Sequence, residues 1–146
     1  MRSIMATGLA VMLLMAANAQ AADLTEDEKA LQGSWTLVSG EADGEKLPEK
    51  EIKGGKLVLK GNDYTVELPG KETVKGVQKL DSAKDPGTID ITDANGPNKG
   101  KTCRGLYKLT DDEFRVVFGA PGKPRPTKFA TEADSGQWMH VWKKTE

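Results

Sequence analysis

The chain has 146 residues and carries 21 Lys and Arg against 22 Asp and Glu, which gives a formal net charge of −1. This near balance provides no electrostatic reason to bind nucleic acid or an anionic membrane surface. A single cysteine, Cys103, excludes an internal disulfide, so packing and hydrogen bonds must stabilise the fold.

The first residues have the pattern of a secretory signal peptide. Arg2 precedes an apolar run over residues 4–17, and Ala19-Gln20-Ala21 supplies an A-x-A cleavage site. An uncleaved anchor is the alternative, but the run is shorter than the ~20 residues that span a bilayer. We predict a signal peptide over residues 1–21, no membrane span after its cleavage, and a periplasmic or extracellular protein. Residues 22–146 then form a single domain with a net charge of −2, from 20 basic and 22 acidic residues once Arg2 is removed.

The predicted elements begin with a short helix. Thr25 and Glu28 have the spacing of a capping box, which predicts one or two helical turns through about Leu31. Beyond it, apolar residues alternate with period two between Gly, Asn and Asp turn signals, which is typical of short strands. We predict strands at residues 33–40, 55–61, 63–68, 72–81, 87–92, 102–110, 113–119 and 136–144, with a further short strand at 128–132.

Short links between consecutive strands require them to run antiparallel. A meander of eight or nine such strands exposes two edges unless it closes on itself. We therefore predict an all-β fold: an antiparallel up-and-down β-barrel of about eight strands with a short N-terminal helix.

Residues 93–105, DANGPNKGKTCRG, contain the letters of a phosphate-binding loop at Gly100-Lys101-Thr102. That motif needs a Gly five positions before Gly100, where Asn95 stands, and a helix after the loop, where the sequence alternates like a strand. A calcium loop of the helix–loop–helix type also fails, because Thr102 occupies the position of the bidentate Glu. A looser calcium site at Asp93 and Asn95 is an alternative. We predict a turn-forming connector between two strands, with no cofactor and no metal.

Catalytic patterns are weak throughout the chain. His140 is the single histidine, and no Gly-x-Ser-x-Gly elbow is present. A Cys103–His140 pair would need the two side chains to be adjacent and the thiol to be exposed, which nothing in the sequence indicates. We predict that the protein is not an enzyme. Trp138, His140 and Trp142 share one face of the last strand, and that face is either core, the lining of a ligand cavity or a partner surface.

Gly33-Ser34-Trp35, which opens the first strand after a short helix, resembles the signature of lipocalins and their calycin relatives. In those proteins the Trp packs across the closed end of the barrel, often under a basic side chain from near the last strand. The resemblance implies that Trp35 closes the barrel, with Lys143 or Lys144 as its basic partner, although Lys replaces the usual Arg.

The segments LQGSWTLVSGEADGEKLP, IDIT, NGPNKGKT, GLYKLTDDEFRVVF and GKPRPTKF also occur in this order. From about residue 31 to 144, the chain resembles a family of exported lipocalin-like domains of planctomycete bacteria whose function is uncharacterised. This resemblance implies a lipocalin-like fold and supplies no activity, ligand or catalytic residue.

The sequence therefore predicts an exported, non-enzymatic β-barrel that binds a small apolar ligand in its interior. The candidate cavity residues are Tyr64, Tyr107, Trp138 and His140, with Arg125 near a mouth of the barrel. The alternative is an envelope-associated interaction module or inhibitor that contacts another protein through its loops, with Arg125 in the Pro-rich segment 119–129 as the candidate contact. Barrels of about eight strands are either filled by side chains or just wide enough for one small ligand.

Overall fold

The computed structural model describes residues 24–145, so the predicted signal peptide lies outside the described residues. Within them, the chain forms two short helices, α1 (Glu26–Leu31) and α2 (Glu49–Ile52), and nine strands. The strands are β1 (Gly33–Ala42), β2 (Glu45–Lys46), β3 (Lys56–Lys60), β4 (Asp63–Glu67), β5 (Val74–Asp81), β6 (Gly87–Asp93), β7 (Thr102–Leu109), β8 (Glu113–Phe118) and β9 (Trp138–Lys144).

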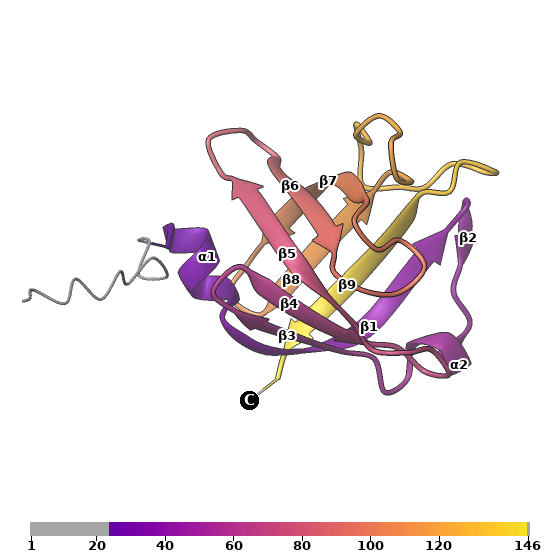
Figure 1. Cartoon of the computed structure of the whole chain (residues 1–146), viewed down its shortest axis with the longest axis horizontal. Helices are drawn as coiled ribbons and strands as arrows, with labels where there is room; N and C mark the ends of the chain where they lie inside the picture. The colour runs from indigo at the N-terminus through magenta and orange to yellow at the C-terminus, as the bar shows by residue number, and fades with distance from the viewer. Residues whose placement is uncertain (1–23, 146) are drawn as a thin grey trace, which may run out of the picture.

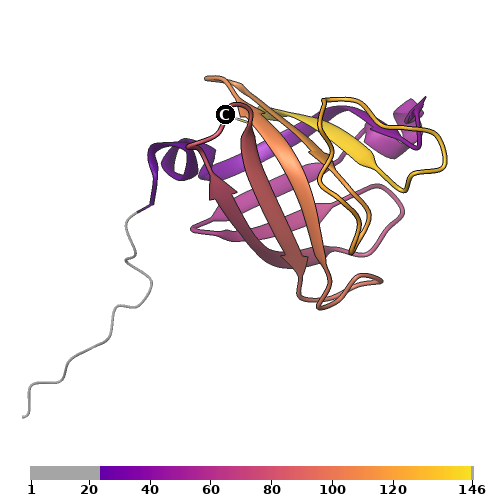
Figure 2. The same ribbon diagram turned by 90° about the horizontal axis from the view of Figure 1, so that it is seen from above.

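The strands form a closed barrel (Figures 1 and 2). From β3 to β9, each strand pairs antiparallel with the next, and β1 pairs with both β3 and β9, so eight strands close the ring. β2 is a two-residue strand that forms a hairpin with the end of β1 and is not part of the ring. The predicted all-β, up-and-down barrel is confirmed, and it is consistent with a lipocalin-like fold. Neither of the helices in the described part of the chain is long and apolar enough to cross a membrane.

β1 closes the barrel because it is long enough to pair along both of its edges. Residues 33–36 pair with β3, and residues 35–42 pair with β9. The register with β9 shifts between Leu37 and Ser39, which marks a bulge, and Val38 is left 43% exposed there. On the other face, Trp35 and Leu37 are buried, as the alternation of β1 predicts.

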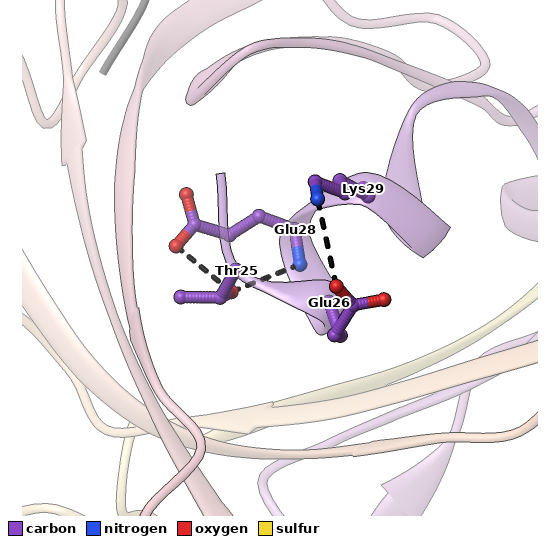
Figure 3. Close-up of polar contacts among 4 residues, drawn as sticks. All are labelled: Thr25, Glu26, Glu28 and Lys29. Atoms are coloured by element: carbon purple, nitrogen blue, oxygen red, sulfur yellow. Dashed lines mark hydrogen bonds and ion pairs between the residues drawn. The ribbon is translucent and has the colours of Figure 1, made fainter. Parts of the chain in front are cut away.

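α1 lies at one end of the barrel (Figure 1), where Leu31 is completely buried in the core. The helix starts at the predicted cap: the Thr25 hydroxyl accepts a hydrogen bond from the Glu28 N–H at 3.2 Å. The same hydroxyl donates to the Glu28 carboxylate at 3.0 Å, and Lys29 contacts Glu26 at the surface (Figure 3). The cap satisfies an N–H group of the first turn and so stabilises the start of the helix.

The segment that looks like a phosphate-binding loop is a connector. β6 ends at Asp93, and β7 begins at Thr102 where that motif requires a helix. Gly96 and Gly100 have φ of 82° and 77°, conformations that favour glycine. The Asn95 side chain accepts from the Lys75 N–H and donates to a main-chain carbonyl just before β5, which ties the loop to the neighbouring hairpin.

The strand predicted at 128–132 is wrong. Residues 119–137 form a long connection outside the barrel, drawn in orange to yellow in Figure 2. Thr131 donates its N–H and its hydroxyl to the Glu41 carboxylate, at 3.0 and 2.6 Å, instead of pairing with a neighbouring strand. Pro124 and Pro126, just before it, lack the N–H groups that a strand would need.

Candidate functional site

The interior of the barrel contains a cavity of about 360 Å³, here called the barrel cavity. It occupies the end away from α1, where the β6–β7 connector and α2 contribute to its rim. Its principal lining residues are Ala42, Leu47, Glu51, Leu57, Tyr64, Val66, Leu68, Lys71, Val74, Gln78, Ile89, Ile91, Asp93, Asn98, Phe114, Val116, Phe118, Trp138, His140 and Trp142. This volume lies at the lower end of the range for small-molecule sites, about 300–1,000 Å³.

The lining is divided into two unlike walls. The aromatic wall, on β8 and β9, consists of Phe114, Phe118, Trp138 and Trp142. The aliphatic wall, on β3 to β6 and the turn after β4, consists of Leu57, Val66, Leu68, Val74, Ile89 and Ile91. In the ring of eight strands β4 and β5 are four places from β8 and β9, so the two walls face each other across the cavity.

His140 lies within the aromatic wall, with its ring edge-on to Trp142 at 5.5 Å between centroids. It is half-buried, its ring lines the barrel cavity, and no hydrogen bond joins the ring to another side chain or main-chain group of residues 24–145. Burial, with a smaller effect from the nearby positive charge of Lys71, lowers the pKa of His140 from 6.5 to about 4. The imidazole is therefore neutral at pH 7, with one donor and one acceptor nitrogen.

Gln78 is the buried polar side chain of the opposite wall. It is only 7% exposed, it lines the barrel cavity from β5, and the described part of the chain offers its amide no hydrogen bond. Gln78 faces inward because it alternates with outward-facing Val77 and Lys79. The amide atoms are open to the cavity, so an occupant that bonds to them gains a hydrogen bond in largely buried surroundings.

Tyr64 lines the cavity from β4, and its ring extends over Gly76 of the next strand. A Cβ at Gly76 would lie 2.2 Å from the Tyr64 hydroxyl, so only glycine leaves room for the ring. The hydroxyl thereby reaches Asp93 on β6 and donates a hydrogen bond to its carboxylate. Burial, followed by this carboxylate, raises the pKa of Tyr64. The pair provides a fixed polar patch in a mainly apolar lining.

Tyr107 does not line the barrel cavity, which corrects its prediction as a cavity residue. Its ring packs at the α1 end, edge-on to Phe114 at 6.3 Å between centroids, and its hydroxyl donates to Asp27 of α1 at 2.6 Å. It lies over Gly87 much as Tyr64 lies over Gly76. Burial, followed by the Asp27 contact, raises the pKa of Tyr107. Its role is therefore to join the helix to the barrel.

Arg125 does not line the barrel cavity either. It lies against the outside of β6 and β7: Nη1 donates to the main-chain carbonyls of Ile89 and Gly105, and Nη2 is 2.8 Å from Asp90 Oδ1. Asp90 Oδ1 accepts no hydrogen bond within residues 24–145, so that contact is a charge–charge one. Asp90 alternates with buried Ile89, which places its carboxylate on the outer face. A long loop has no periodicity from which this position could be predicted.

Trp35 lies at the α1 end, where it is completely buried. Its indole N–H donates to the Leu31 carbonyl at 2.8 Å. Lys144 Nζ lies 4.8 Å from the centroid of the Trp35 ring and donates to the carbonyls of Ala30 and Gln32. The lysine thus joins the last strand to the carboxyl end of α1, where a positive charge is favourable. In this barrel Lys144 occupies the place that the resemblance implied for a basic partner.

The lining offers few groups for reactions. Within the described residues, no group of three or more His, Cys, Asp or Glu side chains could hold a metal ion. Burial, with a contribution from Asp93, raises the pKa of the Cys103 thiol to about 11, so the thiol is protonated at pH 7. What the cavity offers is mainly apolar surface and aromatic rings, with neutral hydrogen-bonding groups and the charged side chains of Glu51, Lys71 and Asp93.

Gln78 and Asp93 are cavity residues that sequence reasoning missed. The sequence contained a signal for both, because each occupies an inward position of an alternating strand. Gln78 pairs in register with Ile91, and Asp93 lies two residues after Ile91 on the same face of β6. Polar residues at inward positions are the pattern that could have identified them.

Comparison of the chain with protein-family models, with curated proteins and with solved structures finds no match.

Proposed function

We propose that this protein is an exported, non-enzymatic β-barrel that binds one small, mainly apolar ligand in the barrel cavity. The observation that carries the proposal is the cavity itself: about 360 Å³ inside an eight-stranded barrel, bounded by apolar side chains and by polar groups without partners in the described chain. Side chains that filled the interior would leave no such space.

Asymmetric closure of the barrel supports the same proposal. Trp35, Leu31 and Tyr107 are packed under α1 at one end. At the other end the lining includes the exposed side chains of Glu51 and Lys71, which gives a ligand a route of entry. Export, and hence a role in carrying or holding a molecule in the periplasm or outside the cell, rests on the signal-peptide pattern of residues 1–21.

The test is a search for a natural ligand in protein purified without denaturation from its own cells. Native mass spectrometry should show one extra molecule per chain, which organic solvent extracts. Val74→Trp adds bulk to the aliphatic wall, and Val77→Trp adds the same residue on the outer face of the same strand, where Val77 is 51% exposed. We expect the molecule to be absent from Val74→Trp and retained in Val77→Trp. A wild-type protein without any bound molecule, or equal retention in both variants, contradicts the proposal.

A further inference from the structure

The polar groups and the two walls of the barrel cavity restrict what it can bind, provided that the proposed ligand-binding function holds. We propose that the ligand is an uncharged, flat, ring-containing molecule with one hydrogen-bonding group, and that the Gln78 amide binds this group. According to this proposal, the cavity binds such a molecule more tightly than a flexible anionic chain such as a fatty acid.

The flat shape follows from the aromatic wall. Four rings from two adjacent strands face an aliphatic wall of Leu, Ile and Val side chains. Phe118 and Trp138 lie 5.2 Å apart between ring centroids at an interplanar angle of 31°, so these two rings pack against each other within the wall. Offset stacking and edge-to-face contacts stabilise a bound ring beyond what burial of its area provides, and a flexible chain gains no such term.

The absence of charge follows from the charged groups of the lining, which are Glu51, Lys71 and Asp93. The one cation among them, Lys71, is exposed at the rim, and Asp93 is negative and accepts from Tyr64. Lys71 is the one cationic side chain that the described lining offers, and it is exposed. A carboxylate buried deeper would lose its hydration and meet the negative Asp93, with only this exposed countercharge, which is unfavourable.

The hydrogen-bonding group follows from Gln78. Its amide has two donor hydrogens and an acceptor oxygen, it is more than nine-tenths buried, and it lines the cavity without a partner in the described chain. His140, on the opposite wall, has a neutral ring that can accept or donate one further bond. A hydroxyl or carbonyl on the ligand satisfies the amide, and a hydrocarbon leaves it unpaired.

The size follows from the volume. The cavity of about 360 Å³ is many times larger than the ~30 Å³ that one water molecule occupies in the liquid. A fused two-ring molecule with a hydroxyl is small enough to fit within it. 2-Naphthol is therefore a suitable probe, and three relatives each change one property. Naphthalene lacks the hydroxyl, 2-naphthoate carries a negative charge, and 1-decanol has the same number of carbon and oxygen atoms but no ring.

The test measures the dissociation constants of the four probes at pH 7 by isothermal titration calorimetry, with competition against 2-naphthol for the sparingly soluble ones. We expect 2-naphthol to bind about tenfold or more tightly than 2-naphthoate and 1-decanol. We expect 2-naphthol to bind about five- to tenfold more tightly than naphthalene, which is the effect of one hydrogen bond. In Gln78→Leu this advantage should disappear, whereas Lys79→Leu, on the outer face of the same strand, should retain it.

The outcomes separate this inference from the proposed function. If 2-naphthoate or 1-decanol binds as tightly as 2-naphthol, the inference is overturned and ligand binding in the cavity stands. If Gln78→Leu keeps the preference for 2-naphthol over naphthalene, Gln78 is not the binding group. If no probe binds while the purified protein carries a charged or acyclic molecule, only the inference fails. If no probe binds and no molecule is carried, both fail.

Discussion

Protonation of His140 should destabilise this protein as the pH falls below about 6.5. The imidazole is half-buried in the aromatic wall, it forms no hydrogen bond with residues 24–145, and the charge of Lys71 is near. A positive charge there would be desolvated and repelled. The perturbation that tests this is His140→Phe, which keeps a ring in the wall and removes the titrating group.

The magnitude follows from the two pKa values. The pKa of His140 is about 4 in the folded protein and 6.5 ordinarily, so between these values the unfolded chain binds a proton that the folded chain does not. The contribution of His140 to the free energy of unfolding is therefore constant above pH 7. It falls as the pH decreases through 6.5 and stops falling below about pH 4. At 1.36 kcal/mol for each tenfold change in proton affinity, the total loss is about 3 kcal/mol.

The assay is urea unfolding of wild type and His140→Phe at pH 7, 6, 5 and 4. Carboxylates titrate in both proteins, including Glu41, whose pKa is lowered mainly by the hydrogen bond from the Thr131 hydroxyl, and their effects cancel in the difference. We expect the free energy of unfolding of wild type, relative to the variant, to fall by about 3 kcal/mol between pH 7 and pH 4. Parallel curves for the two proteins would refute the buried, neutral state of His140.

Three further substitutions test the ends and walls of the barrel. Lys144→Met should lower the free energy of unfolding by about 2 kcal/mol, because it removes two hydrogen bonds to carbonyls and a cation–π contact, while exposed Lys143→Met should change it by less than about 0.5 kcal/mol in urea unfolding. Gly76→Ala should lower the melting temperature and cost about 2–3 kcal/mol, since the new methyl group would lie 2.2 Å from the Tyr64 hydroxyl and 2.3 Å from the Thr92 carbonyl oxygen; a melting temperature equal to wild type would contradict this close packing of β4, β5 and β6. Arg125→Ala should cost about 1–2 kcal/mol by thermal unfolding without changing 2-naphthol affinity, and a loss of affinity would place Arg125 in the site after all.

The barrel could be predicted because its determinants are local. Period-two alternation, turn residues and short connections are each visible in the sequence, and together they require an antiparallel meander that closes. The first strand shows this most clearly: alternation puts Trp35 and Leu37 on one face of the predicted strand 33–40, and both are buried. Only the bulge beside Val38 required the structure, because it depends on the register with a strand about a hundred residues away.

The site was harder to predict because alternation gives the face of a strand and not the depth of a residue along the barrel. Tyr64 and Tyr107 both point inward, yet one lines the cavity and the other contacts α1. Which end each reaches depends on strand tilt and stagger, and those follow from all eight strands together. Gln78 was missed for a different reason: it is polar, and the candidate cavity residues were chosen without following the alternation of its strand, which places it inward.

A ¹H–¹⁵N NMR spectrum of the three tryptophan indole N–H groups is the most direct test of where the ligand binds. The ligand is proposed to lie between the aromatic and aliphatic walls of the barrel cavity, away from α1. Trp138 and Trp142 line the cavity, whereas Trp35 is packed under α1 with its N–H bonded to Leu31. Addition of 2-naphthol, or of the natural molecule extracted from the protein, should shift the signals of Trp138 and Trp142 and leave that of Trp35 in place. A shift of the Trp35 signal alone, or three unchanged signals with the ligand bound, would contradict this placement of the ligand.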